Sequence, residues 1–161
     1  MNSIFDERFM DLKNQGLEII ESDTNRPWGG YFVIKENHFQ KFLNIYFKGL
    51  KIDEIKTSKK LSFKILIVAP NKRLSWQYHK RRSEICKVIS GKVDVITSND
   101  NLERKKILLK QGDLIKLSQD ERHRIIGTNE YATMAEIWIH TDEKNLSDEF
   151  DIVRVQDDYG R

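Results

Sequence analysis

The chain has 161 residues, of which 39% are hydrophobic and 33% charged, and this supplies one domain with a core of its own. The 28 basic and 25 acidic residues leave a net charge of +3 and form no long block of one sign, so nothing indicates a nucleic-acid partner. A single cysteine excludes an intramolecular disulfide, and no apolar run suits a signal peptide or a membrane span. We therefore expect a cytoplasmic protein that binds neither nucleic acid nor membrane.

Two amphipathic segments in residues 1–60 predict helices. The first, 4–15, places four apolar residues along one side and stops at Gly16: Ile4, Phe5, Phe9 and Leu12. The second, 38–48, has the spacing of a buried helical face: Phe39, Phe42, Leu43, Tyr46 and Phe47. We interpret 1–60 as an N-terminal extension whose helices cap the rest of the domain; a lid or a dimer surface is the alternative.

From residue 61 onward the pattern predicts an all-β structure. Short alternating runs separated by polar turns cover 63–69, 74–79, 84–90, 92–98, 105–109, 113–117, 123–127 and 132–140. Strands without intervening helices indicate an antiparallel sandwich or barrel. We therefore predict one domain, 1–161, with its barrel in 61–161.

One stretch, 71–91, carries a candidate metal site. Side chains two apart on a strand share a face, so Gln77 and His79 can point into one interior together, and Glu84 begins the next strand after a polar bend. His123, at the start of a later strand, is the best fourth candidate. The alternative for each histidine is a structural or surface role. Such a mixed set of nitrogen and oxygen ligands suits one divalent ion, with zinc the first choice and manganese, iron, cobalt or nickel as alternatives.

The stretch resembles the first motif of the cupin superfamily. Asn71, Gln77, His79, Glu84 and Gly91 fit its spacing without a gap, although Asn71 stands where the family usually has glycine and Gln77 where most members have histidine. This resemblance implies that the barrel is a cupin-type jelly roll.

The second cupin motif is recognisable around His123. Gly112, Ser118, Asp120, His123 and Gly127 keep its spacing, while its proline, second glycine and asparagine are replaced. The replaced residues shape a turn in the family, so the motif does not predict the conformation of that loop here. The candidate ligand His123 keeps its position in the motif.

Within the superfamily, the chain resembles the cupin domain of type II phosphomannose isomerases over residues 26–161. The matching segments are Arg26-Pro27-Trp28-Gly29-Gly30-Tyr31, Leu74 to His79 with Arg82 and Glu84, His123-Arg124, and Asp151 to Arg161. Similar stand-alone bacterial proteins are labelled phosphoheptose isomerases. The resemblance implies a phosphorylated sugar as substrate and, for Arg26, Trp28, Arg82 and Arg154, a role in binding it; the alternative for Arg26, Trp28 and Arg154 is that they close the barrel.

The implied reaction is a metal-dependent aldose–ketose isomerisation, first of all of mannose 6-phosphate to fructose 6-phosphate. It needs a Lewis acid and a base that moves a proton between adjacent carbons. Arg124, next to a ligand, is the candidate for electrostatic stabilisation of the enediolate, although a strand would point it away from the face of His123. Glu136, a carboxylate among apolar neighbours, is the candidate base, and we interpret His140 as a surface residue.

Three alternatives stay open: a heptose-phosphate isomerase with the same metal site, a cupin dioxygenase that uses Fe(II), and a non-catalytic sugar-binding or assembly module. Cupins often pair through barrel edges, so we also expect a homodimer.

Overall fold

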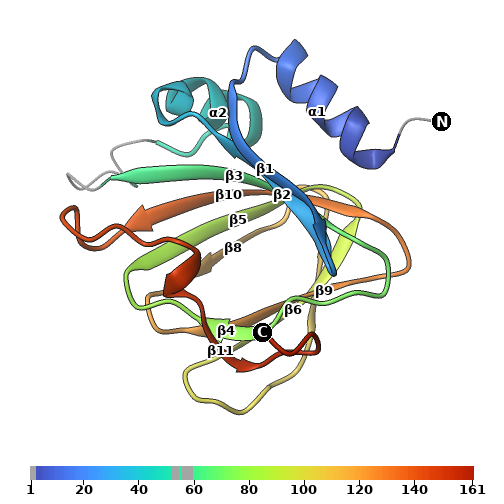
Figure 1. Cartoon of the computed structure of the whole chain (residues 1–161), viewed down its shortest axis with the longest axis vertical. Coiled ribbons are helices and arrows are strands. Elements are labelled where there is room, and N and C mark those ends of the chain that lie inside the picture. Colours follow the sequence, from blue (N-terminus) through green and yellow to red (C-terminus); the bar gives the residue numbers. More distant parts are fainter. Residues whose placement is uncertain (1–2, 52–54, 56–59) are drawn as a thin grey trace.

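The computed structural model describes residues 3–51, 55 and 60–161. Within this part the chain forms two helices, two short 3-10 turns and two antiparallel sheets (Figure 1). The elements are α1 (Ile4–Asn14), β1 (Ile19–Arg26), β2 (Gly29–Ile34), η1 (Glu36–His38), α2 (Phe39–Tyr46), β3 (Leu61–Val68), β4 (Trp76–Tyr78), β5 (Arg82–Ser90), β6 (Lys92–Ser98), β7 (Ile107–Lys110), β8 (Leu114–Leu117), β9 (Arg122–Gly127), β10 (Ala132–His140), η2 (Glu149–Asp151) and β11 (Val153–Gln156).

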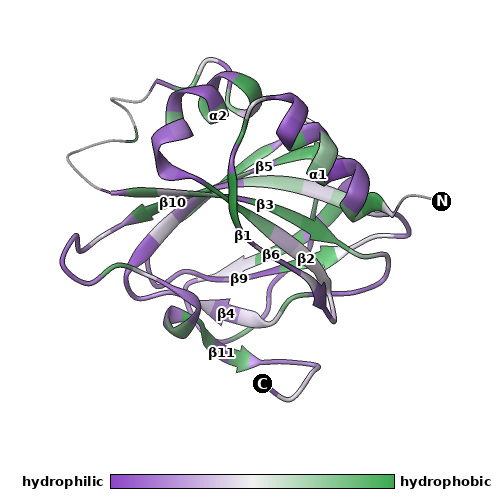
Figure 2. Cartoon of the chain, turned by 45° about the horizontal axis from the view of Figure 1, so that its top comes forward, coloured by the Kyte–Doolittle hydropathy of each residue, from purple (hydrophilic) through white to green (hydrophobic). Residues whose placement is uncertain are grey.

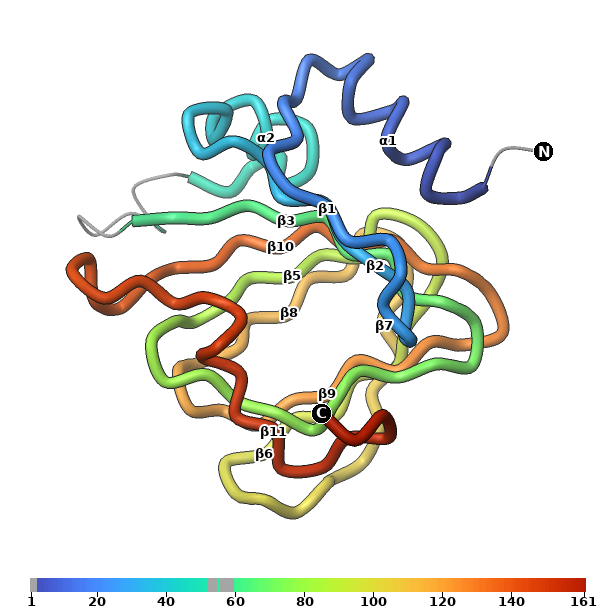
Figure 3. Tube along the Cα trace, in the orientation of Figure 1, coloured from blue at the N-terminus to red at the C-terminus, as the bar shows by residue number. Residues whose placement is uncertain are grey.

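The sheets face each other as a cupin-type jelly roll, which confirms the predicted fold class (Figure 3). The larger sheet has the order β1-β2-β3-β10-β5-β8, and the smaller one β11-β4-β9-β6-β7. Each predicted strand from 63 to 140 is present within a few residues of its expected bounds. The expected homodimer stays a prediction.

Both predicted helices are present. A capping box starts α1, in which the Asp6 amide donates to Ser3 Oγ (3.2 Å) and the Ser3 amide donates to the Asp6 carboxylate (3.0 Å). The second predicted helix begins as a 3-10 turn and becomes α-helical at Phe39. Residues 52–54 and 56–59 of the predicted extension lie outside the described residues.

The strands β1 and β2 are an addition to the sequence analysis, which assigned only helices to 1–60. They pair with each other, and β2 pairs with β3 from Gly29–Val68 to Ile34–Phe63, so the larger sheet begins well before residue 61. The pattern of β1 hides it, because most of its side chains are polar and exposed.

The central strands of the larger sheet, β3 and β10, are buried on both faces. The sheet's outward side chains pack with those of the helices, which lie over that face (Figures 1 and 2), and the cluster includes Leu12, Phe42, Phe63, Ile65 and Ile137. Its inward side chains meet those of the smaller sheet in a second cluster, which includes Leu66, Cys86, Val88, Val95 and Met134. The predicted capping role of the helices therefore fits their position.

Phe42 provides the test of this packing. Its side chain is fully buried, and its ring centroid lies 5.1 Å from that of Phe63. Phe42→Ala should lower the free energy of unfolding by about 3–5 kcal/mol, measured by denaturant unfolding, because it leaves a cavity between α2 and the sheet. Ile45→Ala, on the same helix but 37% exposed, is the control and should cost much less. Equal losses would contradict a helix anchored through Phe42.

Candidate metal centre and its pocket

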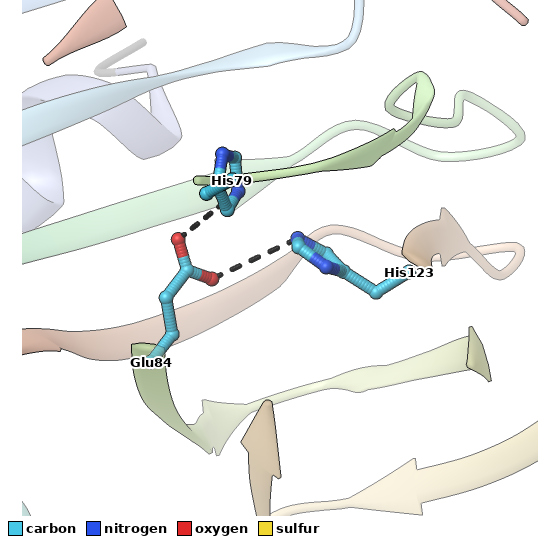
Figure 4. A group of neighbouring side chains, drawn as sticks. All are labelled: His79, Glu84 and His123. Atoms are coloured by element: carbon cyan, nitrogen blue, oxygen red, sulfur yellow. Dashed lines mark ion pairs between the residues drawn. The ribbon is translucent and has the colours of Figure 1, made fainter. Parts of the chain in front are cut away.

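Three predicted ligands meet between the sheets (Figure 4). His79 follows β4, Glu84 lies in β5 and His123 lies in β9. The Nε2 atom of His79 is 3.3 Å from one oxygen of Glu84, and Nε2 of His123 is 3.8 Å from the other. All three residues are buried, and the two imidazole centroids are 5.0 Å apart.

Hydrogen bonds fix the tautomers of both imidazoles. His79 Nδ1 lies 3.0 Å from the Asp151 carbonyl, and His123 Nδ1 lies 3.1 Å from the Glu121 carbonyl. A carbonyl oxygen only accepts, so each Nδ1 carries the proton and donates it. In an imidazole with its one proton on Nδ1, the lone pair is on Nε2, the atom that faces Glu84 in both residues, and metal-binding histidines use this arrangement.

The charges of the group also suit a metal ion. Burial lowers the pKa of His79 to about 3, so its imidazole is neutral at physiological pH. Burial alone would raise the pKa of Glu84, but the adjacent Arg82 guanidinium outweighs it and keeps the pKa low. Imidazole nitrogens together with a carboxylate are a typical donor set for a divalent ion. Arg82 donates to Glu84 (2.7 Å) and to His79 Nε2 (3.1 Å), so a metal would compete with it for that lone pair.

The fourth predicted ligand, Gln77, lies beside the triad. It pairs with His123 across β4 and β9, and with Arg154 across β4 and β11. The side chains of all three line one pocket. Its amide oxygen accepts a hydrogen bond of 2.5 Å from Ser75 Oγ, which orients the amide.

The two residues that replace glycine in the cupin motifs keep the turn conformations. Asn71 has a φ of 58° and Asp120 a φ of 66°, both in the left-handed region. Asparagine and aspartate tolerate this region better than other residues with a side chain. The Asp120 amide donates to the His79 carbonyl (2.9 Å), so the altered loop still holds the end of β4.

Glu84 and His123 of the triad line a pocket of about 590 Å³, which includes space open to solvent. Its lining contains every predicted substrate-binding residue and Glu136, together with residues that the sequence analysis did not assign. The lining is Arg26, Trp28, Tyr31, Lys64, Leu66, Leu74, Ser75, Gln77, Arg82, Glu84, His123, Ile125, Glu136, Trp138, Glu149, Ile152, Arg154 and Arg161.

Cationic side chains outnumber carboxylates in this lining. Lys64 pairs with Glu149 (2.9 Å), and Arg161 pairs with Asp157 (2.9 Å) outside the lining. Arg26 lies 2.8 Å from Asp23. Within the described part of the chain, the buried Nε of Arg154 has no hydrogen-bond partner. The pocket can therefore accept an anionic group without breaking an ion pair at Arg154.

Glu136 is a buried carboxyl group in the same pocket. Burial and the charge of Glu84 raise its pKa to about 8. Trp138 Nε1 donates to one of its oxygens (3.3 Å), and the Cys86 thiol is 3.8 Å from the other. Cys86 itself is fully buried, as expected for a core residue.

Arg124 does not line the pocket. Its guanidinium donates to the Leu74 carbonyl (3.0 Å), to the Gln156 carbonyl (3.1 Å) and to Glu103, on the other face of the smaller sheet from His123. Adjacent residues on a strand point to opposite faces, which explains this position. The structure thus does not support contact of Arg124 with a substrate; its bonds fasten β11 to β9.

His140 is a correction. It is 1% exposed, its Nε2 lies 2.7 Å from Ser62 Oγ, and its Nδ1 accepts from the Ser147 amide (3.0 Å). His140 lies an even number of residues after Glu136 and Trp138 on the same strand, so its side chain points to the same inward face. This alternation was visible in the sequence and indicated burial. Lys64 had a similar signal, a charged residue inside an apolar strand.

The family model for the C-terminal domain of mannose-6-phosphate isomerase matches residues 38–157. The chain belongs to this family. No curated protein gives a significant match. No helix in the described residues has the length and apolar character that a membrane crossing requires.

Two of the solved structures described here match this fold with a TM-score above 0.5. An oxalate decarboxylase OxdC variant from Bacillus subtilis is 14% identical with a TM-score of 0.59, over 84% of this chain and 30% of that one. KdgF from Halomonas sp. is 11% identical with a TM-score of 0.54, and the match covers 77% of this chain and 89% of KdgF. The plu4264 protein from Photorhabdus luminescens is 25% identical with a TM-score of 0.43, and the match covers 52% of this chain and 64% of plu4264. The chain thus spans less than two thirds of the length of plu4264 and of OxdC.

The raised pKa of Glu136 predicts a pH dependence of stability. The native state keeps a proton there that the unfolded chain releases, so this contribution is complete below pH 4.5 and is lost as pH rises through about 8. Glu136→Gln, a neutral substitute, should therefore be more stable than the wild type near pH 9 by about 1 kcal/mol or more. The difference should shrink toward pH 5, as measured by denaturant unfolding with a chelator present. The exposed Glu143→Gln is the control, and a difference independent of pH would contradict a protonated Glu136.

Proposed function

We propose that the chain is a metal-dependent sugar-phosphate isomerase that interconverts mannose 6-phosphate and fructose 6-phosphate. One observation carries the proposal: His123, Gln77 and Arg154 lie opposite one another on three adjacent strands and line one pocket. Two steps between strands span roughly 10 Å, so a metal-binding end and an anion-binding end lie within one small molecule's length. Membership of the family adds support.

In this proposal His79, Glu84 and His123 hold one divalent ion, with Gln77 as a fourth ligand. When bound, the ion would polarise the carbonyl and the neighbouring hydroxyl of the open-chain sugar. Zinc is the first candidate, and manganese, iron, cobalt and nickel fit the same donor atoms. The buried setting strengthens each electrostatic contact with the substrate.

Glu136 is the proposed proton carrier. An isomerisation takes a proton from one carbon and returns one to its neighbour through an enediol, so the base must both accept and release a proton near neutral pH. The raised pKa of Glu136 matches this requirement, and its carboxyl group lines the pocket. The hydrogen bond from Trp138 holds the carboxyl group in place.

Arg154 is the proposed anchor for the phosphate, because its buried Nε lacks a partner in the described residues. Arg26 and Arg161 add positive charge to the same pocket. Arg82, which already contacts two ligands, can position a substrate oxygen beside them. Trp28 provides an apolar wall for the sugar.

Two alternatives compete with this proposal. A heptose-phosphate isomerase would use the same ligands and the same arginine residues. A non-catalytic sugar-binding module would bind a sugar phosphate in this pocket without turnover.

The deciding experiment is turnover of mannose 6-phosphate by protein that has been stripped with a chelator and resupplied with zinc, manganese, iron, cobalt or nickel separately. We expect metal-restored formation of fructose 6-phosphate, and His79→Ala should lose metal binding and activity together. Activity retained in the stripped protein would refute the metal role. Turnover of heptose phosphates alone, or ligand-induced stabilisation without product, would favour the corresponding alternative.

Arg154→Gln should raise the KM for mannose 6-phosphate by roughly 10-fold or more with a smaller change in kcat, because a charge-assisted hydrogen bond is lost from ground state and transition state alike. Steady-state kinetics measures both constants. Arg104→Gln, at an exposed arginine outside the pocket, is the matched control. An unchanged KM would remove Arg154 from the phosphate site.

A further inference from the structure

Residues 141–152, here called the strap, run from the end of β10 to β11 and so connect the larger sheet to the smaller one (Figure 3). The strap contains the turn η2. Its hydrogen bonds reach both sheets close to the metal ligands, although none of its residues belongs to the ligand set.

Asp151 is the strap residue that contacts a ligand directly. Its backbone carbonyl accepts the proton of His79 Nδ1 at 3.0 Å, in a buried position. The opposite ring nitrogen, Nε2, accepts from Arg82, a side chain that only donates. The two contacts require the same tautomer, with the lone pair on Nε2.

The carboxylate of Asp151 holds the backbone just after that histidine. It accepts from the amides of Lys80 and Arg81 (both 3.0 Å) and from Ser147 Oγ (2.6 Å). The residue is 5% exposed. Asp151 therefore fixes His79 twice, through its ring and through the main chain that follows it.

A chain of hydrogen bonds extends from Asp151 to a second ligand. Ser147 Oγ donates to Asp151 and accepts from Arg82 Nη1 (2.8 Å), and Arg82 Nε donates to Glu84 (2.7 Å). The Ser147 amide is itself held by His140 Nδ1. Each member has a partner, so the path is fully connected from the strap to the carboxylate.

We propose that Asp151 is a positioning residue that aims His79 and, through Ser147 and Arg82, Glu84 at a common point. The proposal rests on the metal site of the proposed function. Partners of this kind orient metal ligands, and their loss typically lowers metal affinity by 10–100-fold.

The test is a titration of the full chain with Co²⁺, in which binding is monitored through the visible absorption of the bound ion. Asp151→Asn places an amide NH₂ against groups that all donate, so at least one hydrogen bond is lost while the backbone carbonyl remains. We expect Asp151→Asn to bind Co²⁺ 10–100-fold more weakly and with an altered spectrum. Asp142→Asn is the matched control on the same strap, because among the described residues the Asp142 carboxylate accepts a hydrogen bond only from the Lys144 amide of its own turn.

Ser147→Ala is the second variant, in case Asp151→Asn fails to fold. It removes the hydroxyl between Asp151 and Arg82 and should weaken Co²⁺ binding several-fold. The proposal would be overturned if the Asp151 and Ser147 variants had the same Co²⁺ affinity and the same absorption spectrum as Asp142→Asn.

A second measurement needs no metal. Nitrogen-15 NMR of the imidazoles in the chelated wild type should show His79 protonated at Nδ1, and Ser147→Ala and any folded Asp151→Asn should show a mixture of tautomers. Protonation at Nε2 in the wild type would overturn the proposal. If the wild type binds no Co²⁺, the proposed metal site falls, whereas the tautomer measurement still decides what Asp151 does to His79.

Discussion

The burial of β3 and β10, the central strands of the larger sheet, on both faces is the constraint on which the site depends. Alternate side chains of β3 and β10 point to opposite faces, so Phe63 and Ile65 meet the helices while Lys64 and Glu136 face the interior. A shift of one residue in the strand register would press the charged groups against α2. The helices therefore fix the register and, with it, the position of the pocket's charges.

Within the pocket, Lys64 and Arg82 each pair with a carboxylate. Lys64 lies 4.0 Å from the centroid of the Tyr31 ring and 4.4 Å from that of Trp138, while it pairs with Glu149. Arg82 lies 3.5 Å from the Trp138 ring centroid and binds Glu84. Removal of one partner from the buried Arg82–Glu84 pair is costly, because it leaves an uncompensated charge. These pairs hold the side chains still, and a preorganised site loses little free energy on binding.

The sequence predicted the parts of this molecule that repeat a pattern. Strand alternation located β3 to β10, and the spacing of Gln77, His79, Glu84 and His123 identified residues that the fold brings together. Contacts between distant segments had no such signal: the carbonyl of Asp151 on His79 depends on the path of the strap, and the exposed polar residues of β1 do not alternate. His140 shows a different failure. Strand alternation placed its side chain on the inward face, but the residue was predicted to lie at the surface, and it is buried.

The pairing of β11 with β4 has a consequence for folding. It joins residues that are about 76 positions apart, since Val153 lies opposite Tyr78 and Arg154 opposite Gln77. Closing so long a loop costs chain entropy before any contact offsets it, so pairings of this kind form late. We expect the two sheets to assemble first and the edge that carries Arg154 to dock last, so that the chain acquires its barrel before it acquires its binding site.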